Sequence, residues 1–67
     1  MFDPEKVPIL LEKIRGKLLI SIHDMCHKIG IVFYTYKRLM NKEKVQPKTQ
    51  RRVTDFIRKN SRSILWN

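Results

Sequence analysis

The segment 21–41 constrains the fold most, because it contains two short amphipathic helix patterns separated by one glycine. The first pattern covers residues 22–28 and follows Ser21, whose hydroxyl can cap a helix that has an acidic residue three positions later. The second pattern covers residues 32–40. Gly30 lies between the two, at the point where a sharp turn favours a positive φ. We therefore expect two helices joined by a tight turn.

Each of these helices is predicted to bury one side, because its apolar residues recur at spacings of three and four. The residues are Ile22, Met25, Cys26 and Ile29 on the first helix and Tyr36, Leu39 and Met40 on the second. Ile31, directly after the glycine, is expected to fill the angle between the helices. The opposite sides of both helices are therefore expected to face solvent.

The outward side of the second helix carries an unusual set of side chains. They are Phe33, Tyr34, Lys37, Arg38 and Asn41. Aromatic rings, cations and an amide together on one exposed side are typical of a helix that contacts a partner. The alternative is that Phe33 and Tyr34 belong to the core of a rotated helix. It is disfavoured because the other side already supplies a buried stripe.

Two further helices are predicted, one before this pair and one after it. The first is expected to start at Pro4, after Asp3 as N-cap, or at Pro8, and residues 18–20 are expected to lead the chain into the core. Its apolar stripe consists of Val7, Leu10, Leu11, Ile14 and Leu18. The last helix begins at Pro47 and runs to about residue 59. Its apolar positions, which we expect to close the core against the first helix, are Val53, Phe56 and Ile57.

The pattern as a whole predicts an all-α fold, a compact bundle of four or five helices containing a helix-turn-helix. The alternation expected of half-buried strands is missing, and the chain has only 2 glycines. With 67 residues there is room for one domain over residues 1–67. A chain of this size buries a small core, so we expect a partner or a second copy to stabilise it.

The charge is concentrated in one half of the chain. Its net value is +9. Residues 1–36 carry five lysines and arginines against four acids, whereas residues 37–67 carry ten against two, a net of +8. A one-sided positive field suits a polyanionic partner. The alternative is a basic surface kept for solubility, although solubility is usually met with mixed charges.

The run G-I-V-F-Y-T-Y-K-R-L-M-N, residues 30–41, resembles the helix-turn-helix of the lambda-repressor-like DNA-binding superfamily. The matching positions are Gly30, Ile31, Thr35, Arg38, Leu39 and Asn41. The continuation V-Q-P-K-T-Q-R-R-V is similar to the linker and next helix of Lac-repressor-type headpieces and of small phage and plasmid Cro/C1-type regulators. A helix ahead of the motif favours the Cro/C1 type. Val32 departs from the usual serine cap, and Tyr36 replaces a small β-branched core residue.

The resemblance implies sequence-specific binding of double-stranded DNA by a small transcriptional regulator, a repressor of phage, plasmid or mobile-element type. Such a protein would be cytoplasmic, in a bacterial cell or an infected host, and associated with DNA. In the geometry of the motif, the start of the second helix enters the major groove. The residues expected to contact bases are Val32, Phe33, Tyr34 and Arg38. Those expected to contact phosphates are Ser21, His23, Thr35, Lys37, Asn41, Lys44 and Lys48.

The C-terminal segment 61–67 contains three large apolar residues in an otherwise basic stretch, namely Ile64, Leu65 and Trp66. Large apolar side chains are seldom left in water together. They either dock on the first helix or form a contact between two copies. We favour the second, which makes this segment a dimerisation tail and the protein a homodimer.

Other classes of function are disfavoured by what the sequence contains. His23 and His27 flank Cys26, but one short helix lacks the second ligand pair of a structural zinc site. We expect no metal, no cofactor, no small-molecule substrate, no enzymatic activity and no membrane partner. Two rival functions stay open. One is a protein-interaction module of the same fold, for example a viral inhibitor of a host protein; the other is a nonspecific nucleic-acid binder, including one that binds RNA.

Overall fold

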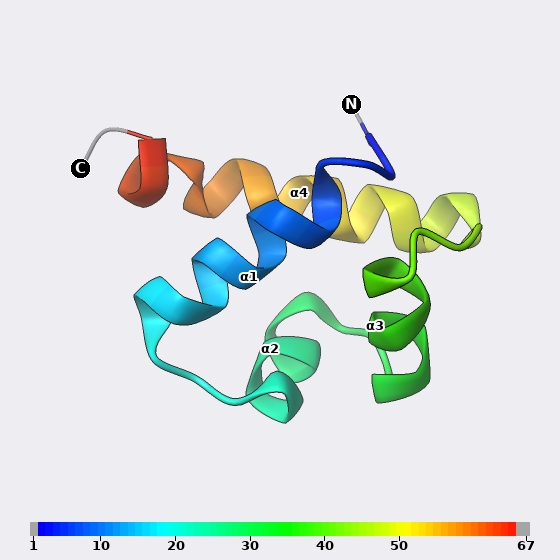
Figure 1. The fold of residues 1–67 in the computed structure, drawn as a ribbon, viewed down its shortest axis with the longest axis horizontal. Coiled ribbons are helices and arrows are strands. Elements are labelled where there is room, and N and C mark those ends of the chain that lie inside the picture. Colours follow the sequence, from blue (N-terminus) through cyan, green and yellow to red (C-terminus); the bar gives the residue numbers. More distant parts are fainter. Residues whose placement is uncertain (1, 66–67) are drawn as a thin grey trace.

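A computed structural model describes the backbone of residues 2–65 and the side chains of residues 2–61. This part of the chain forms four helices, α1 (Val7–Leu18), α2 (Ile22–Ile29), α3 (Phe33–Met40) and α4 (Pro47–Leu65), and it contains no strand (Figure 1). The principal extents are 31 × 24 × 17 Å, with a radius of gyration of 10.8 Å. The prediction of a compact all-α bundle is therefore confirmed.

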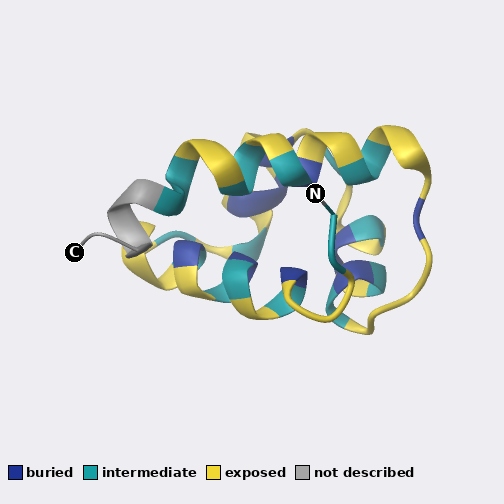
Figure 2. Ribbon diagram, turned by 90° about the horizontal axis from the view of Figure 1, so that it is seen from above, coloured by how far each residue is buried: buried dark blue, intermediate teal, exposed yellow. Residues whose placement is uncertain are grey.

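The four helices form two layers. α1 crosses α4, and this pair makes the most extensive contact between helices (Figure 1). The shorter helices α2 and α3 lie together below the pair, where α2 contacts α4 and α3 contacts α1. The buried positions of the helices face a common interior, and the exposed positions of α4 line its outer side (Figure 2). α1 and α4 therefore act as the frame on which the α2–turn–α3 unit is held.

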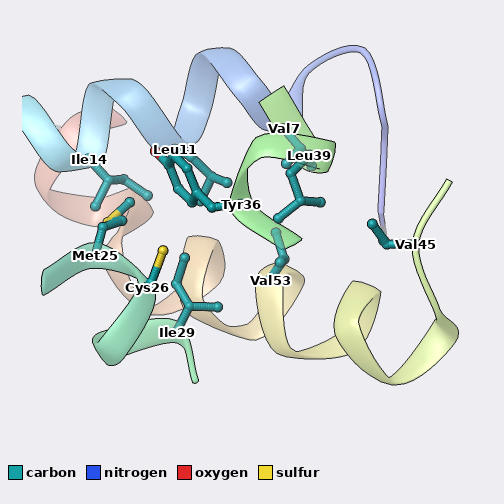
Figure 3. Packing of buried hydrophobic residues seen from close by; sticks show 10 residues of the cluster. All are labelled: Val7, Leu11, Ile14, Met25, Cys26, Ile29, Tyr36, Leu39, Val45 and Val53. Carbon is teal, nitrogen blue, oxygen red and sulfur yellow. The ribbon is translucent and has the colours of Figure 1, made fainter. Parts of the chain in front are cut away.

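The core is a single cluster of apolar side chains drawn from all four helices and one loop. Tyr36 is its largest fully buried member, with 1% of its surface exposed. Val45 reaches the cluster from the loop between α3 and α4 (Figure 3). The cluster consists of Val7, Leu11, Ile14, Met25, Cys26, Ile29, Tyr36, Leu39, Val45 and Val53.

Local sequence explains both ends of α2. The Ser21 hydroxyl accepts a hydrogen bond from the backbone N–H of Asp24 at 3.1 Å, which caps the start of the helix. At the other end, Gly30 has a φ of +88°, and its N–H donates to the carbonyl of Cys26 at 2.8 Å. Both features agree with the sequence-based prediction. The chain then needs only Ile31 and Val32 to reach the first residue of α3.

The end of α1 differs from the prediction. Leu18 and Leu19 do not enter the core; they are 39% and 89% exposed, and only Ile20 is partly buried. Leu19 has a φ of +57°, in the left-handed region, and its N–H donates to the carbonyl of Gly16 at 3.3 Å. This conformation ends the helix and reverses the chain, so the side chain of Leu19 points outward.

The last helix is also longer than predicted, since it ends at Leu65 rather than near Lys59. The side-chain amide of Asn60 donates to the carbonyl of Phe56 at 2.8 Å, and the Ser61 hydroxyl donates to the carbonyl of Arg58 at 3.0 Å. These bonds let two polar residues continue the helix. The predicted dimerisation contact of Ile64, Leu65 and Trp66 lies outside the described side chains.

Candidate nucleic-acid interface

The first turn of α3 presents three large side chains to solvent. Val32, directly before the helix, is 65% exposed, and Phe33 and Tyr34 are 43% and 67% exposed. Tyr36 and Leu39, on the other side of the helix, are buried. The alternative in which Phe33 and Tyr34 belong to the core is therefore wrong. These three residues, Val32, Phe33 and Tyr34, are called the apolar tip below.

Neighbouring side chains hold the Phe33 ring in place at the surface. The His23 ring of α2 lies 5.4 Å from the Phe33 ring, centroid to centroid, at an interplanar angle of 33°. On the same helix, Lys37 Nζ lies 5.8 Å from the Phe33 centroid. The apolar body of the phenyl ring is thus flanked by a polar ring and a cation. The structure thus brings His23 and Lys37, predicted to contact phosphates, next to Phe33, predicted to contact bases.

Arg38 lies beside Tyr34 of the apolar tip, and its guanidinium bonds to the loop that follows α3. Its Nη2 donates to the carbonyl of Lys44 at 2.7 Å, and its Nε lies 3.7 Å from Glu43 Oε1. The guanidinium also lies 5.9 Å from the Tyr34 ring centroid. Base contact by Arg38 stays a prediction, and it requires the side chain to leave the Lys44 carbonyl.

Two shallow grooves run between α3 and the start of α4, and both are lined by Thr35 and Thr49. One, of about 310 Å³, is bordered by Tyr34, Thr35, Arg38, Lys44, Val45, Gln46 and Thr49. The other, of about 280 Å³, is bordered by Gly30, Ile31, Val32, Thr35, Lys48, Thr49 and Arg52. Three of the residues predicted to contact phosphates, Thr35, Lys44 and Lys48, therefore meet along this line. The sequence pattern did not single out Gln46.

The remaining predicted phosphate contacts lie at other helix ends. Ser21 and His23 are exposed at the first turn of α2, where the Ser21 hydroxyl already accepts the capping hydrogen bond. Asn41 is exposed at the end of α3, and Lys37 is exposed one helical turn after Phe33. The predicted set thus spreads over both edges of α3 rather than forming one cluster.

Arg52 of α4 has a structural role that sequence reasoning missed. Its side chain is exposed, and its Nη1 donates to the Gly30 carbonyl at 2.6 Å. The two residues are 22 positions apart, so no local pattern could have revealed the bond. This hydrogen bond joins α4 to the turn that sets the direction of α3. One cation of the basic half is therefore used to position the apolar tip.

The His23, Cys26 and His27 side chains do not converge. Cys26 is buried in the core, and burial raises the pKa of its thiol. Both histidines are exposed on the outer side of α2. Cys26 is thus a core residue, as the spacing of the apolar positions predicted. Within residues 2–65, no helix has the length and apolar character needed to cross a membrane.

Comparison of the chain with protein-family models, with curated proteins and with solved structures found no match. What this surface can bind is therefore inferred from its own side chains alone. It combines an apolar tip on a short helix with exposed cations on both of its edges. Such a surface suits a partner whose own surface has apolar edges framed by negative charge.

Proposed function

We propose that this protein binds double-stranded DNA by placing the first turn of α3 in the major groove, and that it acts as a small transcriptional regulator. The observation that carries the proposal is the apolar tip, exposed on the outward side of the second helix of a helix-turn-helix. A helix with its side chains is about 10–12 Å in diameter, and the major groove is about 12 Å wide. α3, with 8 residues, is about 12 Å long.

The charge distribution supports a duplex as the partner. DNA carries one phosphate charge for roughly every 1.7 Å of its axis, so a row of cations gains free energy by releasing counterions. Lys44 and Lys48 border the grooves on one side of α3, and Lys37 lies on α3 itself. In the proposed complex these residues bind the backbone and set the register, while the apolar tip faces the bases.

The subfamily proposed is the Cro/C1 type of the lambda-repressor-like superfamily, with repressors of phage, plasmid or mobile elements as the closest functional kind. α1 precedes the helix-turn-helix, which supports this type over Lac-type headpieces. We propose a homodimer joined through residues 61–67. Its two α3 helices would then enter successive major grooves, about 34 Å apart along one side of the duplex.

Selection from a pool of random-sequence duplexes tests this function most broadly. The expected result is an enriched motif, bound more tightly than random duplexes, with an affinity that falls steeply as salt is raised. Salt-dependent binding without an enriched motif would favour the nonspecific nucleic-acid binder. Absence of binding at low salt would contradict the proposal.

A second candidate function is supported by the same exposed rings. Phe33 and Tyr34, each next to a cation, would also suit an apolar groove with acidic edges on another protein. Pull-down from a nuclease-treated extract separates the two functions. A DNA-binding protein should lose its partners after nuclease treatment, whereas a protein-interaction module should retain them.

A further inference from the structure

The residue that precedes α3 is a poor choice for folding. Val32 occupies the N-cap position, where its side chain makes no capping hydrogen bond. Serine, threonine, aspartate and asparagine are preferred there because they bind a free backbone N–H. The same molecule uses Ser21 in this way at the start of α2. Since Val32 is also 65% exposed, neither helix capping nor the core accounts for it.

Val32 does, however, extend an apolar surface. It adjoins Phe33 and Tyr34 at the leading end of α3, and the three together form the apolar tip. Two arginines near it are bonded to backbone carbonyls: Arg38 Nη2 donates to Lys44 and Arg52 Nη1 donates to Gly30. The apolar tip itself is therefore mostly hydrocarbon. Its polar group is the Tyr34 hydroxyl, and His23 and Lys37 lie beside Phe33.

The base edges in a major groove differ in what they offer to such a surface. Guanine, cytosine and adenine present hydrogen-bond donors and acceptors, whereas thymine also presents a 5-methyl group. We infer that the apolar tip selects thymine, by burying 5-methyl groups of the duplex against Val32 and Phe33. This inference rests on the proposed function and names the feature of DNA that the site reads.

The inference has a direct chemical consequence, because uracil is thymine without the 5-methyl group. Replacing thymine by uracil leaves base pairing and hydrogen-bond patterns intact. Loss of one buried methyl should weaken binding about fourfold, and loss of two about fifteenfold. Guanine should matter less at these positions, since Arg38 is held by the loop.

The experiment uses the full chain and one pair of duplexes. A duplex enriched from a random pool is synthesised once with thymine and once with uracil at every thymine position, and both are titrated by fluorescence anisotropy. Weaker binding of the uracil duplex, by fourfold or more, is expected. Equal affinities, or binding without any enriched sequence, would overturn the inference while leaving DNA binding in place. No binding to any duplex would overturn the proposed function as well.

Val32→Ser provides a variant that should not fail through unfolding. Serine can cap α3, so the melting temperature should rise. Affinity for the thymine duplex should fall about fourfold toward that of the uracil duplex, and affinity for the uracil duplex should stay the same. Ile9→Ser, which also removes an exposed apolar side chain but on α1, should change neither affinity. An equal loss on both duplexes for Val32→Ser would overturn the contact assigned to Val32.

Discussion

The Tyr36 hydroxyl of α3 donates a hydrogen bond of 2.6 Å to Glu12 Oε2 of α1. The same carboxylate accepts from Arg15 Nη2 at 2.7 Å, and Arg15 Nη1 donates to the Ile20 carbonyl at 3.2 Å. This series of hydrogen bonds links α3, α1 and the segment before α2. It also lets a tyrosine occupy the centre of the core, because its hydroxyl reaches a partner at the edge.

Tyr36→Phe should lower the free energy of unfolding by about 1 to 2 kcal/mol, because it removes one hydrogen bond to a charged group and leaves the ring in place. Urea denaturation measures this change. Tyr34→Phe is the matched control, since Tyr34 is 67% exposed and should have almost no effect. Equal stability of the two variants would contradict the role of the Tyr36–Glu12 bond.

The Glu12 carboxylate should make the free energy of unfolding depend on pH. Hydrogen bonds from Arg15 and then Tyr36 lower the pKa of Glu12 in the folded protein. The stabilisation is therefore present above the ordinary pKa of glutamate and is lost as pH falls through the lowered folded value. Glu12→Gln should flatten the decline in unfolding free energy between about pH 5 and about pH 2. A parallel decline in both proteins would contradict this assignment.

The two glycines, Gly30 in the turn before α3 and Gly16 in α1, should respond to alanine with opposite signs. Gly30→Ala should destabilise by about 1 to 2 kcal/mol, because φ is +88° and an added Cβ would lie 3.0 Å from Arg52 Nη1. Gly16→Ala should stabilise α1 by about 0.5 to 1 kcal/mol, since a Cβ there meets nothing within 4 Å. Thermal unfolding of both variants checks the pair. A stabilising Gly30→Ala would contradict the turn described above.

Much of the fold could be predicted because it depends on local pattern. The spacing of apolar residues in segment 21–41 predicted the buried sides of α2 and α3, and Ser21 and Gly30 predicted where α2 begins and ends. The exposure of Phe33 and Tyr34 followed from the same periodicity, because the outward side of a helix is set once its buried side is known, whereas Val32 was expected at the surface only from the resemblance.

The other contacts could not be predicted, because each depends on distant parts of the chain or on backbone geometry. The Tyr36–Glu12 and Arg52–Gly30 bonds join residues 24 and 22 positions apart. Val45 is buried because the loop folds over the core, although its neighbours in sequence are polar. Leu19 points outward because its left-handed backbone reverses the chain, and such a conformation is uncommon for leucine.

Glu43 should weaken binding to DNA in the proposed complex, because its carboxylate lies 3.7 Å from Arg38 Nε and repels the phosphates. Glu43→Gln should therefore tighten binding to all duplexes and raise the number of counterions released by about one. The slope of log affinity against log salt measures this number. Glu5→Gln, which removes an exposed acid that pairs with Lys42 at 3.0 Å, is the control for net charge alone. The same effect from both variants would show that Arg38 plays no particular part.

The central claim is that the first turn of α3 reads bases while the cations beside it bind phosphates. Its most direct test is the affinity of Phe33→Ala and Lys48→Ala for an enriched duplex and for a random one. We predict that Phe33→Ala reduces only the preference for the enriched duplex, whereas Lys48→Ala weakens both duplexes alike and lowers the salt dependence. Equal losses on both duplexes for Phe33→Ala would contradict the account.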